Sequence, residues 1–349
     1  MESGRAAADM KMTMLAQDTF ESDGGDAIPT RHAIRPRRVT PWTVVAVAIL
    51  CVGSVVPRSS RASSPTPGNA ADDYRRAFDE IGRLPEADGT LPAAGERLPP
   101  AGTSQAIVAR LSPAMKCLHE ATARQQCDWG TDLPRRGAAA TFPHVPRSQD
   151  LARRALFRAR WQWHMRDRDQ ALADARAVVV LARRVGDEGN SGLLGLTERY
   201  KIEQTVVDVL RQWMTDAESA RLMDDLFRLA LQPDENLPKA GLLQFRQYIG
   251  KLDGAGNPFS QVAIVRCPGI PAAYLQSRKL RAQWTILRAA SEVLRRGPDA
   301  AKEIDDPYGN GPLKYQATSE GFTLRSTLVI DGKDVALEFA KTPREPPEK

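Results

Sequence analysis

Apolar side chains recur at helical spacing through the middle of the chain, between residues 72 and 300. The clearest pattern runs from Ser148 to Gly186, where two apolar stripes are separated by the polar run Arg166–Asp169. Spacing of three and four residues puts these side chains on one face of a helix, so the segment predicts two antiparallel helices. Ser148 is expected to cap the first helix and Gly186 to end the second. Further helices are expected over residues 72–81, 103–124, 193–214, 216–231, 239–249 and 271–296.

The second half of this predicted hairpin, from Arg168 to Ala175, resembles the turn and second helix of a tetratricopeptide repeat. Small residues such as Ala171 and Ala175 stand where the two helices of such a repeat approach closely. No second copy follows about 34 residues away, so a repeat array is not expected. We expect a single hairpin of tetratricopeptide-like (TPR-like) type, with a generic helical domain as the alternative.

The pattern changes from helical to alternating near the C-terminus. Apolar and polar residues alternate around Phe322 and Leu337, and Asp331-Gly332 is a strong signal for a tight hairpin turn. We expect a two- or three-stranded antiparallel meander over residues 301–341, which must pack on the helices because so small a sheet is marginal alone. The predicted fold is therefore mainly α, with a helical domain at 72–300 and a small C-terminal β meander.

One apolar run, residues 41–57, contains neither a charge nor a polar face. Its length is at the lower end of the roughly 17–25 residues that a spanning helix needs, so it predicts a transmembrane anchor. A cleaved signal peptide is the alternative, although the preceding residues 1–40 alone exceed the usual length of about 15–30 residues. Composition predicts disordered segments at 1–40 and 342–349 and a Ser/Pro/Gly-rich linker at 58–71.

Basic residues immediately before the apolar run indicate the orientation of the anchor. They are Arg31, Arg35, Arg37 and Arg38. The positive-inside rule places such a cluster, and with it the N-terminus, in the cytoplasm. We therefore expect a single-pass protein of the cell membrane whose C-terminal domain is exported.

The composition excludes several classes of protein. Of the 349 residues 42% are hydrophobic, which is too apolar for a fully disordered chain and too polar for a multi-span membrane protein. Four cysteines are too few for a scaffold built on disulfides. The net charge of +6 comes with arginine-rich helices, which we interpret as solvated faces, with anion or lipid head-group binding as the alternative. An exported domain is not expected to bind nucleic acid.

The common catalytic and nucleotide-binding motifs do not occur in the sequence, so no catalytic residue and no cofactor is assigned. Cys117 and Cys127 could form a disulfide in an exported domain. Free thiols are one alternative, and a zinc site with His119 and His144 is another, although the spacing matches no standard zinc motif. A disulfide requires the helix to end near residues 123–126, because ten helical residues would separate the thiols by about 15 Å.

Aromatic residues gather near the end of the first hairpin helix. Trp161, Trp163, His164 and Arg160 form a candidate interaction surface, and the alternative is that the tryptophans belong to the core beside a partly exposed histidine. Farther along, Glu198 and Glu203 are five residues apart, which does not place them together on one tight face. We interpret these two carboxylates as solvated helix surface.

The C-terminal residues 306–310 (Asp-Pro-Tyr-Gly-Asn) and 331–334 (Asp-Gly-Lys-Asp) resemble the end of type II secretion pseudopilins. That resemblance implies a small sheet with a calcium-binding loop, but here the acidic loop is replaced by Val-Ala-Leu-Glu-Phe. The chain also resembles uncharacterised membrane-anchored proteins of planctomycete-type bacteria, through residues 127–129 (Cys-Asp-Trp) and the same tail. That second resemblance implies no activity.

We expect a non-enzymatic, membrane-anchored envelope scaffold or protein-interaction module. Its partners would be the membrane, through one helix, and a protein or peptide in a groove of the helical hairpin. One alternative is an envelope enzyme with a site near His144 and His164. Another is an accessory protein of a secretion apparatus, which the C-terminal resemblance suggests.

Overall fold

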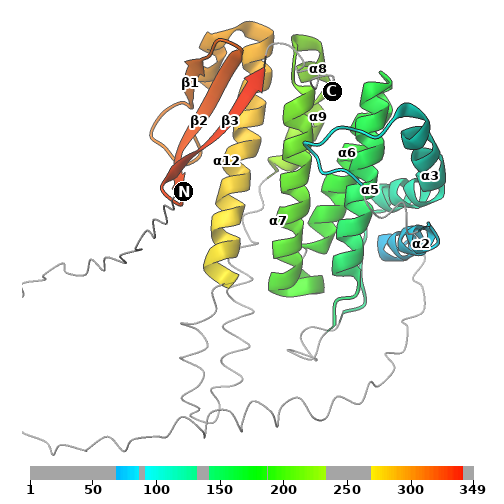
Figure 1. The fold of residues 1–349 in the computed structure, drawn as a ribbon. Coiled ribbons are helices and arrows are strands. Elements are labelled where there is room, and N and C mark those ends of the chain that lie inside the picture. The colour runs from blue at the N-terminus through cyan, green and yellow to red at the C-terminus, as the bar shows by residue number, and fades with distance from the viewer. Residues whose placement is uncertain (1–67, 86–90, 132–140, 187, 233–268, 341–349) are drawn as a thin grey trace, which may run out of the picture. The chain divides into compact units, whose positions relative to one another are not determined.

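The structure, a computed structural model, describes residues 68–85, 91–131, 141–186, 188–232 and 269–340. It consists of helices followed by one small sheet (Figure 1). The helices are α2 (Ala70–Gly82), α3 (Ala101–Ala123), α5 (His144–His164), α6 (Arg168–Val185), α7 (Glu188–Trp213), α8 (Ala217–Leu222), α9 (Asp224–Ala230) and α12 (Gly269–Arg296), and a short 3-10 helix, η3 (Pro298–Glu303), follows them. The strands are β1 (Lys314–Ala317), β2 (Gly321–Ile330) and β3 (Lys333–Ala340).

Some of the predicted segments lie outside the described residues. They are the tails at 1–40 and 342–349, the anchor at 41–57, most of the linker, and the helix at 239–249. Among the residues that are described, no helix is both long and apolar enough to cross a membrane.

The predicted helical hairpin is present as α5 and α6. Arg166 turns the chain with a positive φ of 64°, and the Asp167 side chain caps α6 by accepting a hydrogen bond from the Gln170 N–H. The prediction that Ser148 caps the first helix is wrong, because α5 already begins at His144. Ser148 lies inside the helix, where its hydroxyl donates to the carbonyl oxygen of the residue four positions earlier at 2.8 Å.

Helices α5 and α7 run side by side in the same direction. Trp163 near the end of α5 stacks on Trp213 at the end of α7, with ring centroids 4.5 Å apart. α6 connects the end of α5 to the start of α7 and packs against both helices. α12 covers another side of α7 (Figure 1). The small side chains of Ala171 and Ala175 on α6 are fully buried, which lets neighbouring helices approach closely.

The N-terminal part of the described chain is held by a clamp around Asn69. Its side chain caps α2 through the Ala71 N–H, donates to the Asp128 carbonyl and accepts from the Asp128 N–H, the last two at 2.8 Å. The Ala70 N–H also donates to the Gln126 carbonyl oxygen at 2.9 Å. α2 begins two residues before the predicted position, and the clamp holds its first turn.

Trp129 fills the space that this clamp encloses. It is buried, and its ring stacks on those of Tyr74 and Phe78 from α2 and on His144 from α5. The indole N–H donates to the Arg184 carbonyl oxygen at the end of α6. The short element around Trp129 therefore joins α2, α5 and α6.

The three strands form the predicted antiparallel meander in the order β1-β2-β3. Tyr315, Leu324 and Leu337 stand opposite one another across the sheet, so their side chains share one face. The sheet packs on α12 through β2 and β3 (Figure 1). The hairpin turn falls at Asp331-Gly332, where both residues have the positive φ that a tight turn of this type requires.

The Asp-Pro-Tyr-Gly segment anchors the sheet through the buried side chain of Asp306. Its carboxylate accepts hydrogen bonds from the Tyr308 N–H, from the Ser326 hydroxyl and from both the N–H and the hydroxyl of Thr327. Burial alone would raise the pKa of Asp306, but these donors outweigh it and hold the pKa below its ordinary value. A Cβ at Gly309 would stand 2.8 Å from the Thr327 hydroxyl, so glycine is required for this approach.

We expect Asp306→Ala to lower the free energy of unfolding by about 2–4 kcal/mol, because it removes charge-assisted hydrogen bonds and leaves the buried O–H donor of Ser326 without its acceptor. Urea unfolding at pH 7 measures the loss. Asp306→Asn is the matched control, because it keeps an acceptor oxygen and should cost less. An Asp306→Ala midpoint equal to that of the wild type would contradict the anchoring role.

Candidate functional site

The parallel helices α5 and α7 form the two walls of a groove, which holds two cavities. The sheet-side cavity, of about 690 Å³, lies between the last turns of both helices and the sheet. The helix-side cavity, of about 570 Å³, lies along the earlier turns of the same two helices. Arg160 lines both cavities, so this side chain stands at the boundary between them.

A loop of the chain itself crosses the groove at this boundary. We call residues 91–98 the groove loop; in Figure 1 it is drawn in cyan and reaches from α3 across α5 to α7. Its tip is a tight turn in which the Glu96 N–H donates to the Ala93 carbonyl oxygen and the Ala93 N–H donates to the Glu96 carboxylate. Leu91 is buried and holds the start of the loop in the core.

The groove loop is held by side chains from both walls that donate to its main-chain carbonyls. From α5, the Arg160 guanidinium donates to the carbonyl oxygen of Ala93 at 2.7 Å and to that of Glu96. From α7, the Gln212 side-chain amide donates to the Ala94 carbonyl oxygen at 2.8 Å. Burial lowers the pKa of Arg160, and the charge of Glu96 opposes that effect. The tip of the groove loop is thus held by its main-chain carbonyls.

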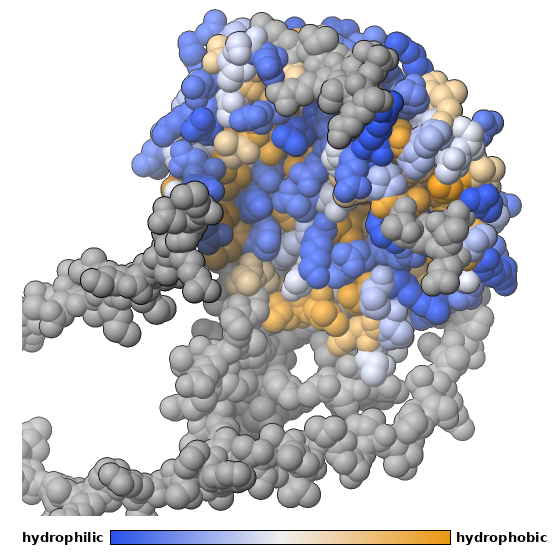
Figure 2. All heavy atoms as spheres, viewed as in Figure 1, coloured by the Kyte–Doolittle hydropathy of each residue, from blue (hydrophilic) through white to orange (hydrophobic). Residues whose placement is uncertain are grey.

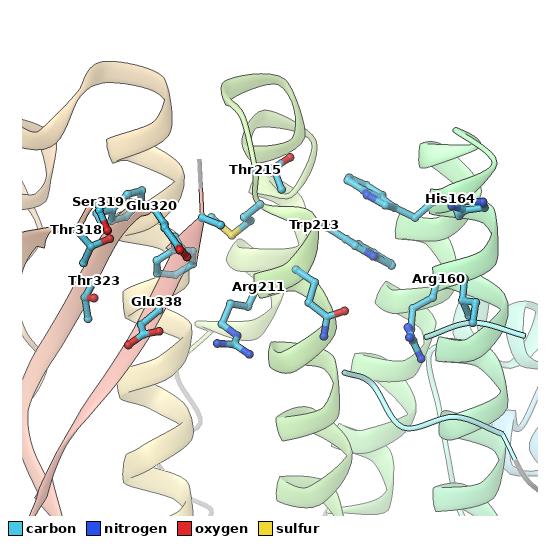
Figure 3. A pocket seen from close by; sticks show the side chains of 17 residues that line it. Arg160, His164, Arg211, Trp213, Thr215, Thr318, Ser319, Glu320, Thr323 and Glu338 are labelled. Carbon is cyan, nitrogen blue, oxygen red and sulfur yellow. The ribbon is translucent and has the colours of Figure 1, made fainter. Parts of the chain in front are cut away.

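The sheet-side cavity is mixed in character. Figure 3 shows Glu338 on the sheet side, Arg211 and Trp213 on α7 in the middle, and Arg160 and His164 on α5 opposite. The full lining is Leu98, Arg160, Trp163, His164, Arg211, Gln212, Trp213, Met214, Thr215, Thr318, Ser319, Glu320, Phe322, Thr323, Glu338, Phe339 and Ala340. Aromatic rings and opposite charges in one open cavity suit a peptide better than a small apolar ligand.

Much of the face shown in Figure 2 is hydrophilic, and apolar surface gathers at its lower end, where α7 and α12 begin. The large exposed apolar side chains in these first turns are Leu194, Tyr274 and Leu275. Arg278 lies over the Tyr274 ring, with the guanidinium carbon 5.8 Å from the ring centroid. This apolar surface is at the opposite end of α7 from Trp213 and the sheet-side cavity.

The structure brings three of the four predicted surface residues into the sheet-side cavity. Arg160, Trp163 and His164 line it, whereas Trp161 is buried, with its ring centroid 5.8 Å from that of His164. Trp163 is half-buried and carries Arg168 over its ring at 5.3 Å, as well as the α7 tryptophan. The indoles therefore form a fixed wall of the cavity.

Cys117 and Cys127 do not form a disulfide in the structure. α3 ends at Ala123, so the helix end that a disulfide requires is present, yet the bond is not formed. Burial of Cys117 raises the pKa of its thiol, which keeps it protonated and unreactive.

The four side chains considered for zinc do not converge. Among the residues that the structure describes, no three His, Cys, Asp or Glu side chains are placed to hold a metal ion. His119 pairs with Asp174, and His144 stacks on Trp129 with ring centroids 4.3 Å apart.

His144 and His164 are not parts of one site. They stand at the two ends of α5, about 30 Å apart along the helix axis. His144 is buried in the aromatic stack, and only His164 lies at a cavity. The structure therefore does not bring His144 and His164 together in one enzyme site.

The sequence pattern did not predict the buried polar interactions of Asp174. Its fully buried carboxylate lies 2.7 Å from His119 Nε2 of α3, 3.0 Å from Arg158 Nε of α5 and 3.2 Å from the Gln170 amide of its own helix. The signal was available, because Asp174 interrupts an otherwise apolar stripe that includes Ala171 and Val178. An acid on a buried face requires charged or polar partners.

The interpretation of Glu198 and Glu203 as solvated surface is wrong. Both are buried, and Glu203 forms an ion pair of 2.7 Å with Arg199 in which each side chain is 6% exposed. α7 is packed by α5, α6 and α12, which cover the face that its sequence suggested was free. Gly186 at the end of α6 makes the room, because a Cβ there would stand 2.5 Å from the Arg199 side chain.

No known protein family, curated protein or solved structure matches this chain.

We expect His144 to reduce stability in mild acid. Its burial, and secondarily the charge of Arg75, lower its pKa to about 4. The unfolded chain takes up this proton near pH 6.5, so stability should decline as the pH falls from 6.5 toward 4. The expected loss between pH 7.5 and pH 5 is about 2 kcal/mol.

Urea unfolding of the wild type and of His144→Phe at the two pH values measures this loss. Phenylalanine keeps the stack on Trp129 but cannot titrate, so the variant should lose less stability between pH 7.5 and pH 5. Equal losses in both proteins would show that His144 is not responsible.

Proposed function

We propose that this chain is a non-enzymatic, membrane-anchored interaction module of the cell envelope, and that its partner binds in the groove between α5 and α7. The predicted anchor at 41–57 would hold the helical domain at the membrane. The basic cluster before the anchor supports an exported domain.

The observation that carries this proposal is the groove loop. A segment of chain already occupies the groove, and Arg160 and Gln212 from the two walls hold it by its main-chain carbonyls. Side chains that read backbone groups can hold segments of different sequence, which suits peptide recognition. The cavities on either side of the loop leave room for a partner segment to extend.

The arrangement of α5, α6 and α7 supports the TPR-like interpretation. In tetratricopeptide repeats, successive antiparallel helices are ordered so that every second helix lines a concave binding surface. Here α5 and α7 have that relation, with α6 returning between them. The buried Ala171 and Ala175 stand at the close approach that this type of hairpin needs.

Selection of a phage-displayed random peptide library on the full-length chain in detergent tests the proposal. Selected peptides should bind Gln149→Trp at least about tenfold more weakly than the wild type, because this exposed residue lines the helix-side cavity and an indole there would narrow the groove. Arg288→Trp is the matched control, since Arg288 is an exposed position on α12 outside both cavities.

The affinity of the same peptides for Arg288→Trp should be unchanged. Enriched peptides that bind all three proteins equally would contradict a groove between α5 and α7, as would a library from which no peptide is enriched.

A further inference from the structure

The groove loop offers the Arg160 guanidinium carbonyl oxygens and no carboxylate as hydrogen-bond acceptors. Arg160 is a buried cation, 9% exposed, and its guanidinium donates hydrogen bonds to the neutral carbonyl oxygens of residues 92, 93 and 96. The Glu96 carboxylate acts on it only through space, because that carboxylate accepts from the Ala93 N–H within the turn. A guanidinium binds a carboxylate bidentately and about twice as strongly as it binds neutral acceptors.

The other charges of the sheet-side cavity leave the position at Arg160 open to an anion. In the helix-side cavity, the carboxylate of Asp150 is paired with Arg153 and Arg154, and that of Asp208 accepts from the Gln204 amide. The carboxylates that line the sheet-side cavity, Glu320 and Glu338, belong to the sheet, and Figure 3 places Arg211 between them and Arg160. The Arg211 Nε is buried and has no hydrogen-bond acceptor among the described residues. A negative group that binds next to Arg160 would therefore lie closer to the guanidinium groups of Arg160 and Arg211 than to the carboxylates of the sheet.

We propose that the groove binds the C-terminal end of a partner peptide, with the terminal carboxylate on Arg160 at the place of the Glu96 carbonyl, and that the groove loop is an internal competitor which this peptide displaces. This inference rests on the proposed function and names the class of partner. The loop shows how the ligand lies: one carbonyl is replaced by the terminal carboxylate, and the carbonyls before it are bound by Arg160 and Gln212.

Displacement of the groove loop would join the two cavities into one groove. Both are lined by Arg160, and the loop residues that separate them are held at the tip by only a few hydrogen bonds. The tethered loop has a high effective concentration, of the order of millimolar, so it competes well with a free peptide of similar chemistry. The ion pair between a terminal carboxylate and Arg160 is the additional interaction that allows a free peptide to displace the loop.

Fluorescence anisotropy with a peptide copied from the loop tests the proposal. The probe is Leu-Pro-Ala-Ala-Gly-Glu, labelled at its N-terminus, with either a free C-terminal carboxylate or a C-terminal amide. The proteins are the full-length wild type, E96A, and a variant in which residues 91–98 are replaced by a Gly/Ser segment of equal length. We expect the affinity for the free acid to rise from wild type to E96A to the replaced loop, and the acid to bind at least about tenfold more tightly than the amide.

Arg160→Gln should abolish the difference between acid and amide, whereas Arg288→Gln should preserve it. If the replaced loop impairs folding, E96A still tests the proposal, because this substitution removes only the hydrogen bond between the Ala93 N–H and the Glu96 carboxylate in the turn. Equal affinity for acid and amide in all variants would overturn the proposal, and so would a replaced loop that binds no better than the wild type. If library peptides still respond to Gln149→Trp in that case, the proposed function stands and only this inference fails.

Discussion

The buried carboxylate of Asp174 is the interaction on which the helical domain depends. An isolated charge in a protein interior costs several kcal/mol, so Asp174 is tolerated only where its donors meet it. Those donors come from three helices: His119 from α3, Arg158 from α5 and Gln170 from α6. The requirement selects one arrangement of the three helices among the many that apolar packing alone would allow, and it sets the position of α5.

Two arginines on α5 bind different kinds of acceptor, one in the interior of the domain and the other in the groove. Arg158 and Arg160 are two residues apart, which turns them about 200° from each other around the helix. Arg158 forms an ion pair with the Asp174 carboxylate, whereas Arg160 donates to carbonyl oxygens of the groove loop. The interior contact joins two opposite charges, whereas the outer contacts join a charge to neutral carbonyl oxygens, which the carboxylate of the proposed peptide would replace. The α5 wall of the groove is fastened on its inner side by the ion pair between Arg158 and Asp174.

The sequence predicts the elements well and their mutual contacts poorly. Apolar spacing located the α5–α6 hairpin, and Asp331-Gly332 located the strand turn, because both depend on neighbouring residues. The buried state of Glu203 depends on helices far along the chain, and the groove loop reads as a Pro/Gly-rich connector. Its bonds to Arg160 join residues more than sixty positions apart. The local sequence pattern contains no information on such pairings. The sequence therefore predicted only part of the candidate site, namely its indoles and Arg160.

The Asn69 clamp gives the domain a defined point of mechanical attachment. If the segment before it is a tether to the membrane, any tension on the chain arrives first at Asn69 and Ala70. There the hydrogen bonds to Gln126 and Asp128 share the load, and they pass it to the segment around Trp129 rather than to the first turn of α2. α2 would then stay wound under a pull that would otherwise unravel it from its end. Strain at the membrane would not reach the groove until the clamp had opened.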